Sequence, residues 1–159
     1  MENILSLLIW LPVIGMVAIA FIPREREELI RITAAVTTGI QFLLTLSLWG
    51  DFDSNNGSMQ FREWAEWIPS FNIAYHLGVD GLSLPMVILT GMLFFIGVFV
   101  SWNIKKAVKG YFALFLMLNT GVMGCFLAMD FFLFYIFWEV MLLPMYFLIG
   151  MWGGPVSYT

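Results

Sequence analysis

Charged side chains are scarce in this chain of 159 residues, where Asp, Glu, Lys and Arg make up 11% and hydrophobic residues 61%. Soluble domains contain about 25% charged and about 45–50% apolar residues. The few charges cluster between long apolar runs, so the composition predicts an integral membrane protein. The net charge of −4 therefore says little about a partner in solution.

Cysteine, histidine and the motifs of soluble enzymes are almost missing. The single cysteine, Cys125, allows no internal disulfide or two-thiol metal site, and we interpret it as a small buried apolar residue. The single histidine, His76, is expected at the surface of an outer loop. The sequence has no phosphate loop, metal-ligand cluster or nucleophile paired with a base. We therefore expect charge movement as its only chemistry, with no cofactor or metal in this chain and no nucleic-acid partner.

Five apolar runs are long enough to cross a bilayer, at residues 4–22, 32–49, 82–102, 110–129 and 131–152. One helix over 110–152 would be about 65 Å long, roughly twice the hydrocarbon thickness. Asp130 divides that run, and an aspartate is a good first residue for a new helix. We therefore predict an all-α membrane protein of about five helices, forming a single module over residues 1–159.

The basic residues predict the orientation of the helices. Six of the seven Lys and Arg residues lie in the connections after the first and third runs. They are Arg24, Arg26, Arg31, Lys105, Lys106 and Lys109, and the opposite side has only Arg62. The positive-inside rule places the two basic connections in the cytoplasm and the N-terminus outside.

The long connection at 50–80 is the only sizeable aqueous segment. Its second half, "FNIAYHLGV" (71–79), places Phe71, Tyr75 and Val79 on one face of an alternating pattern typical of a strand. The stretch "SMQFREW" (58–64) precedes it, so we predict a small β-hairpin on the outer surface. Asp80 follows and is expected to cap the next helix.

Glu139 is the one charge in "FFLFYIFWEVMLLPMYFLIGMW" (131–152). At ~1.5 Å per residue it lies about 12 Å along the helix, close to the bilayer midplane, where an ionisable group costs at least about 2.5–3.5 kcal/mol. Two interpretations remain open: a proton-exchanging group, or a protonated carboxyl that only holds a bundle together. Pro144 favours the first, because a proline frees a backbone carbonyl and kinks the helix beside the glutamate. None of the five runs contains Lys or Arg, so a cation for Glu139 must come from elsewhere.

Other polar residues inside the runs have two interpretations, hydrogen bonds between packed helices or a water-lined path. Four of them recur at a spacing of four residues in the second run, and two lie midway through the fourth. They are Thr33, Thr37, Gln41, Thr45, Asn119 and Thr120. We favour packing. Gly150 and Gly154 form a GxxxG pattern, which is weak support for a contact site.

Two stretches point to a known family: "HLGVDGLSLPMVILTG" (76–91) and "GVMGCFLAMDFFLFYIFWEVMLLPMYFLIGMWGG" (121–154). In order and spacing they resemble the N-terminal part of the chain M family, the antiporter-like proton-pumping membrane subunits of NADH:quinone oxidoreductase, respiratory complex I. The resemblance covers nearly the whole chain. It implies an N-terminal fragment of an antiporter-like fold of about fourteen helices, in a bacterial inner (cytoplasmic) membrane.

The resemblance also implies a role for Glu139. In the family, the glutamate of the fifth helix pairs with a lysine on a later, broken helix, and FMN, iron–sulfur clusters and quinone belong to partner subunits. We therefore expect a translocase subunit without redox chemistry of its own, whose partners are other membrane subunits of complex I. One of these would supply the later helices. The alternatives are a subunit of a related Mrp-type cation/proton antiporter or membrane-bound hydrogenase, and a truncated structural fragment without transport activity. The tail "PVSYT" (155–159) lacks the basic residues usual in the family.

Overall fold

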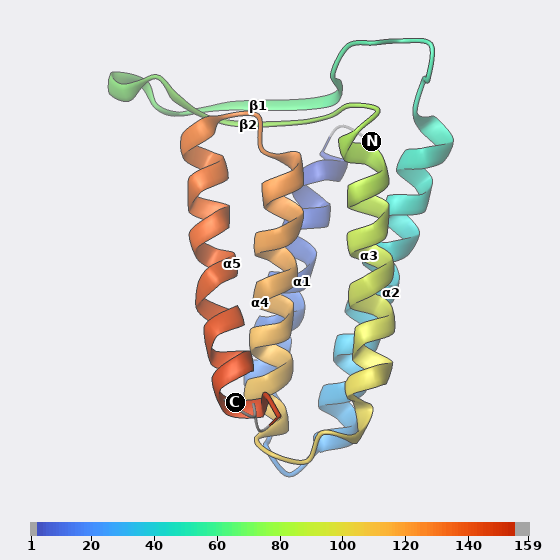
Figure 1. Ribbon diagram of the computed structural model, residues 1–159, viewed down its shortest axis with the longest axis vertical. Coiled ribbons are helices and arrows are strands. Elements are labelled where there is room, and N and C mark those ends of the chain that lie inside the picture. The colour runs from blue at the N-terminus through green and yellow to red at the C-terminus, as the bar shows by residue number, and fades with distance from the viewer. Residues whose placement is uncertain (1–2, 155–159) are drawn as a thin grey trace, which may run out of the picture.

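The computed structural model describes residues 3–154, so the tail at 155–159 lies outside the described residues. Five long helices stand side by side, and a β-hairpin lies across one end of them (Figure 1). All five are long and apolar enough to cross a membrane. The helices are α1 (Ile4–Phe21), α2 (Glu27–Asp51), α3 (Ser83–Val100), α4 (Val108–Leu127) and α5 (Phe131–Trp152). The strands are β1 (Gln60–Ile68) and β2 (Ile73–Val79), and two single turns of 3-10 helix are η1 (Pro69–Phe71) and η2 (Ser101–Asn103).

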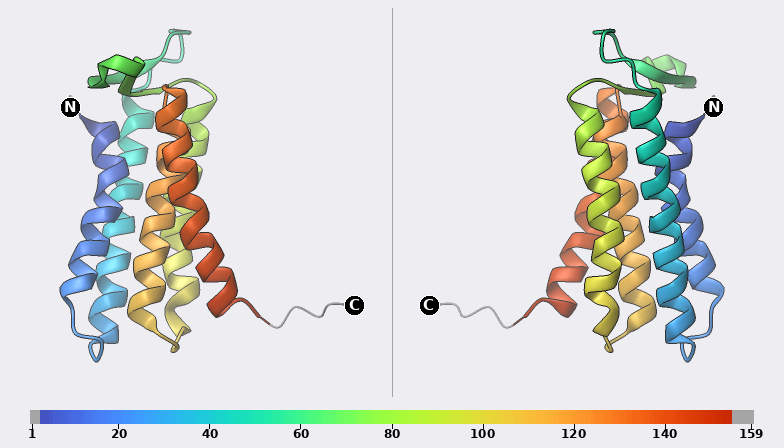
Figure 2. Two further views of the ribbon diagram at one scale, coloured as in Figure 1. Left: turned by 90° about the vertical axis from the view of Figure 1, so that its left-hand side faces the viewer. Right: turned by 90° about the vertical axis from the view of Figure 1, so that its right-hand side faces the viewer.

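Helix α4 is the centre of the bundle. It packs against α1, α2, α3 and α5, whereas α5 packs mainly on α4 and touches β2 (Figure 2). Buried apolar side chains form two clusters, one below the hairpin and one at the opposite end. Leu8, Leu77 and Met123 belong to the first, and Ile19 and Phe112 to the second. Because α5 has a neighbour on one side only, much of its surface is left uncovered.

Helix α2 begins at Glu27, five residues before the apolar run. Its first turn contains Glu27 and Glu28, whose negative charge is favourable at a helix N-terminus. Arg31 lies one turn later, with a guanidinium nitrogen 3.1 Å from the Glu27 carboxylate and 3.0 Å from the Ile104 carbonyl oxygen. The polar residues before the apolar run therefore form the first turn of α2. The length of the apolar run alone did not show this earlier start of the helix.

The predicted hairpin is confirmed, with β1 and β2 paired antiparallel and Trp64 opposite His76. Leu77 and Val79 are fully buried against the helices. The prediction placed Phe71 on the same strand face, and this was wrong. Phe71 belongs to η1 and is exposed, because the chain reverses direction at Asn72 in the left-handed conformation (φ 55°).

Two aspartates bond to amides where helices begin, as predicted: Asp130 is the N-cap residue of α5, and Asp80 lies two residues before Leu82, the N-cap residue of α3. The Asp130 carboxylate accepts hydrogen bonds from the amides of Phe132 and Leu133, at 2.9 and 3.1 Å. The Asp80 carboxylate accepts from the amides of Ser83 and Leu82, at 2.7 and 3.1 Å. The bond from the Ser83 amide is the main reason that the pKa of Asp80 lies below its usual value.

Candidate functional site

Glu139 lies on the exposed face of α5. The buried side chains of this helix are Leu133, Phe137 and Pro144, which form one stripe facing α4. At about 100° per residue, Glu139 is turned by about 200° from Phe137 and about 140° from Pro144, so it points away from that stripe. Only 17% of the span in α5 is buried, compared with 44% for α4. The carboxylate is therefore presented midway along an apolar surface that residues 3–154 leave open.

Two glycines of α4 fix the rotation of α5. A Cβ atom at Gly124 would come within 2.3 Å of the Phe137 ring, and one at Gly121 within 2.7 Å of the Met141 backbone nitrogen. The absence of side chains at these positions lets the two helices approach closely, as in other membrane helix pairs. The contact holds Phe137 inward, and Glu139, two residues later, is thereby held outward.

Within residues 3–154, the ion pairs are those of Arg31 with Glu27 and Glu28, and none involves Glu139. Arg31 and Lys109 are inside helices, because α2 and α4 begin earlier than the apolar runs, but both lie within the first five residues of their helix and far from Glu139 along the bundle (Figure 1). The polar neighbour of Glu139 is Tyr135, which lies one turn earlier on the same exposed face of α5. The described part of the chain therefore supplies a polar neighbour for Glu139 without a counter-charge.

Pro144 lies inside α5 and its ring is buried. A proline has no backbone N–H, so the carbonyl of Val140 loses its usual helical donor one residue after Glu139. The C-terminal part of α5 leans away from α4 (Figure 2), a change of direction that an internal proline commonly causes. The glutamate and the freed carbonyl are neighbours in sequence, in the middle of the helix.

A second polar cluster joins three helices inside the bundle. Pro12 in α1 leaves the Leu8 carbonyl without its helical donor. The buried amide of Gln41 donates to that carbonyl at 2.8 Å, and Asn119 of α4 donates to the Gln41 side-chain oxygen at 2.6 Å. Thr120 donates to the Ile9 carbonyl at 3.1 Å. The packing interpretation is thus correct for Gln41, Asn119 and Thr120, and Pro12 was the sequence signal for the acceptor of Gln41.

The threonines of α2 do not follow the expected pattern of bonds between helices. The hydroxyls of Thr33, Thr37 and Thr45 each donate to a carbonyl of their own helix at 2.7–2.8 Å. The methyl and hydroxyl groups of Thr37 and Thr45 instead fill space beside glycines of neighbouring helices. A Cβ atom at Gly15 of α1 would meet Thr37 at 2.6 Å, and one at Gly91 of α3 would meet Thr45 at 3.1 Å. A threonine can satisfy its hydroxyl locally, so spacing alone cannot tell these two uses apart.

The sequence analysis missed Glu63. This residue of β1 is buried, and its carboxylate accepts hydrogen bonds from the amides of Leu5 and Ser6 and from the Ser6 hydroxyl. The sequence held one indirect signal: the first turn of α1 has no acidic residue, so its free amides need an acceptor from another part of the chain. A partner so remote in sequence could be identified only from the fold.

The remaining polar and glycine positions add no chemistry. Cys125 is only partly buried, and His76 is half-buried in β2, where its carbonyl accepts from the Met129 amide at 2.9 Å. A Cβ atom at Gly150 or Gly154 would meet nothing within 4 Å, so the GxxxG pattern makes no contact within the described residues. No group of three or more His, Cys, Asp or Glu residues that could hold a metal ion occurs in residues 3–154.

Comparison with known proteins gives a consistent result over nearly the whole chain. It is 43% identical over 162 residues to "NADH-quinone oxidoreductase subunit M" of Escherichia coli K12, covering 97% of this chain and 32% of that protein. It is 41% identical over 151 residues to "NADH-ubiquinone oxidoreductase chain 4" of Arabidopsis thaliana, covering 94% of this chain and 30% of that one. The chain is a homologue of NADH-quinone oxidoreductase subunit M. It spans about a third of the length of these subunit M relatives.

Two further comparisons agree with subunit M. The family described as "NADH:quinone oxidoreductase/Mrp antiporter, TM" matches residues 128–158, the segment that contains Glu139 and Pro144. The fold matches a chain of "Respiratory complex I from Thermus thermophilus with bound NADH" with a TM-score of 0.77 and 24% identity, covering 95% of this chain and 30% of that chain. The bundle of five helices and its hairpin therefore form a fold known from a complex I membrane subunit.

Proposed function

We propose that this chain is the N-terminal membrane portion of a proton-translocating NADH:quinone oxidoreductase, with Glu139 as a proton-exchanging carboxylate inside the membrane. The observation that carries the proposal is the position of Glu139, exposed midway along α5 with no counter-charge among residues 3–154. Homology to subunit M supports the choice of complex.

The energetics of a carboxylate in hydrocarbon favour proton exchange. An isolated ionised group there costs at least about 2.5–3.5 kcal/mol, so Glu139 is either protonated or in contact with a cation. Movement of a cation toward or away from it would switch the carboxyl between these two states. Proton uptake and release at Glu139 is the direct result of that switch.

The cation would come from outside the described residues. The open face of α5 is available for another membrane segment, and a lysine on that segment would satisfy both the charge of Glu139 and the apolar surface around it. The greater length of the subunit M relatives is consistent with additional segments.

Other complex I subunits would be the partners and would hold FMN, iron–sulfur clusters and quinone. The location would be a bacterial cytoplasmic membrane, with the N-terminus outside.

The test is Glu139→Gln in the assembled complex, reconstituted in sealed vesicles. Glutamine keeps the size and the polar character of glutamate but cannot exchange a proton. We expect NADH-driven proton uptake to fall severalfold with subunit composition unchanged. Glu25→Gln in the exposed connection between α1 and α2 is the matched control and should leave pumping intact. Normal pumping by a correctly assembled Glu139→Gln complex would leave only the structural interpretation, a carboxyl that packs without transport.

A second candidate is a subunit of an Mrp-type cation/proton antiporter, because the matching family description names both systems. A membrane-bound hydrogenase subunit is the related alternative. Purification of the tagged chain in mild detergent separates them by its companions. Flavin and iron–sulfur subunits with NADH dehydrogenase activity support the first proposal, a nickel–iron hydrogenase supports the hydrogenase, and other antiporter subunits without redox proteins support the Mrp assignment.

A further inference from the structure

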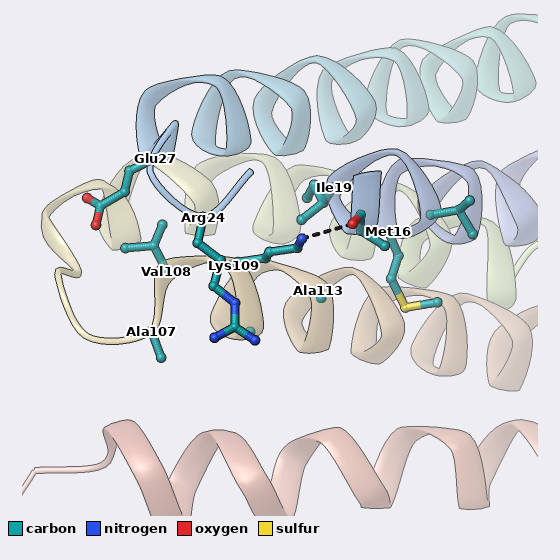
Figure 3. A pocket seen from close by; sticks show the side chains of 11 residues that line it. Met16, Ile19, Arg24, Glu27, Ala107, Val108, Lys109 and Ala113 are labelled. Carbon is teal, nitrogen blue, oxygen red and sulfur yellow. Dashed lines mark hydrogen bonds between the residues drawn. The ribbon is translucent and has the colours of Figure 1, made fainter. Parts of the chain in front are cut away.

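A hollow of about 650 Å³ opens at the end of the bundle opposite the hairpin. It lies where the end of α1, the connection to α2 and the first turns of α4 meet. Figure 3 shows Arg24 and Lys109 together over the hollow, with Glu27 at one edge and Met16 at the other. Its remaining lining is apolar or backbone, from Val17, Ile19, Ala20, Ala107, Val108, Gly110 and Ala113.

The two cations are differently engaged. The ammonium group of Lys109 donates to the carbonyls of Ala20 and Ile22 at 2.8 and 2.9 Å, which leaves one of its three donors free. Arg24 makes no side-chain hydrogen bond or ion pair with any residue between 3 and 154. The acid of the hollow, Glu27, is already paired with Arg31 at 3.1 Å. The hollow therefore presents unused positive charge beside an apolar wall.

The apolar wall continues toward the middle of the bundle. A second hollow of about 480 Å³ shares Met16 with the first, is lined by α1, α4 and α5, and includes Trp10 and part of the hairpin at its far end. From Ala20 to Trp10 the helix rises about 15 Å, which is half of a ~30 Å hydrocarbon core. The stretch of α1 between the charged entrance and Trp10 is therefore about as long as one leaflet, which fits an acyl chain better than a small soluble anion.

We propose that this hollow binds an anionic phospholipid, with its phosphate against Arg24 and Lys109 and an acyl chain along α1 and α4. Basic pockets between membrane helices, close to the headgroup level, are suited to such lipids. Both cations lie at the same end of the bundle as the other basic connections, where anionic lipids are attracted. The site is independent of Glu139 and of the transport function proposed above.

The experiment is native mass spectrometry of the full chain released from nanodiscs of phosphatidylcholine with phosphatidylglycerol. We expect one phosphatidylglycerol to remain bound to the unmodified chain. Its occupancy should be about tenfold lower in Arg24→Gln, because that variant loses one charge-assisted contact with the phosphate. Arg26→Gln, which removes a neighbouring exposed charge outside the hollow, is the matched control and should retain the lipid. Lys109 is left unchanged because its contacts hold the end of α1.

Three results of the mass spectrometry would overturn the proposal. Equal loss in both variants would mean general surface attraction. Equal retention of phosphatidylcholine, which is zwitterionic, would mean that the net negative charge of phosphatidylglycerol is not recognised. Release of the lipid by added inorganic phosphate would indicate a site for a free anion. As a second measurement, phosphatidylglycerol with a photoreactive acyl chain should label the peptide around Met16 in the unmodified chain and not in Arg24→Gln. Labelling that Arg24→Gln leaves unchanged also contradicts the site.

Discussion

The carboxylate of Glu63 accepts a 2.7 Å hydrogen bond from the backbone amide of Leu5, which lies 58 residues earlier. The opposite end of α1 has a matching contact, because the Lys109 ammonium binds the carbonyls of Ala20 and Ile22. An anion at the N-terminus and a cation at the C-terminus of a helix both satisfy unpaired backbone groups and match the helix dipole. Helix α1 has no acidic residue in its first turn and no basic one in its last, so β1 and α4 supply both charges.

Replacement of Glu63 by alanine should therefore loosen α1 from the hairpin. The amides of Leu5 and Ser6 would lose a charged acceptor, and we expect a loss of about 1.5–3 kcal/mol in the free energy of unfolding. Unfolding of the chain by denaturing detergent, followed by circular dichroism, measures this. Glu66→Ala on the exposed part of the same strand is the control, and an equal effect of both substitutions would contradict the assignment.

The relationship between Pro12 and Gln41 predicts a non-additive pair of substitutions. Gln41→Leu removes the donor to the Leu8 carbonyl and should cost about 1–2 kcal/mol of unfolding free energy. Pro12→Ala restores a backbone donor for the same carbonyl, so in that background the cost of Gln41→Leu should be smaller. The double-mutant cycle measures the coupling, and strictly additive effects would show that Gln41 does not compensate for the proline.

The close contact of α4 with α5 predicts opposite effects for two glycines. Gly121→Ala places a Cβ atom within 2.7 Å of the Met141 backbone, which must move, and should destabilise the chain by about 1–3 kcal/mol. Gly150→Ala meets nothing within 4 Å and should be neutral or stabilising by up to about 1 kcal/mol, because alanine favours the helix. Thermal unfolding in detergent compares the two, and equal destabilisation would contradict this packing.

The cap formed by Asp80 predicts an acid-sensitive contribution to stability. Its amide hydrogen bonds favour the ionised form, so the pKa in the folded state is below the ordinary 3.8. The contribution is complete above that ordinary value and is lost as the pH falls through the folded-state pKa. Asp80→Asn should therefore lower the free energy of unfolding near neutral pH and flatten its decline in acid. Asp51 is another aspartate near the outer surface, and Asp51→Asn controls for the loss of one charge. If the free energy of unfolding of Asp80→Asn fell in acid as it does in the unmodified chain, the cap would be ruled out.

Some of the candidate site was accessible from the sequence alone. One carboxylate in a 22-residue apolar run identified Glu139, because a charge in hydrocarbon is costly wherever the helix packs. Asp130 and Asp80 were predicted as caps because their bonds run to amides only two or three residues away. The five apolar helices and the hairpin followed from run length and alternation, which are local properties of the chain.

Only the tertiary structure decided which way Glu139 faces and which residues meet across the bundle. The direction of Glu139 depends on Gly121 and Gly124, whose contacts with Met141 and Phe137 set the rotation of α5. The bonds of Glu63 to Leu5, and of Gln41 to Leu8, join positions 58 and 33 residues apart. Hydropathy cannot encode such pairs, because a polar side chain in a membrane needs some partner and only the packed helices determine which one it meets.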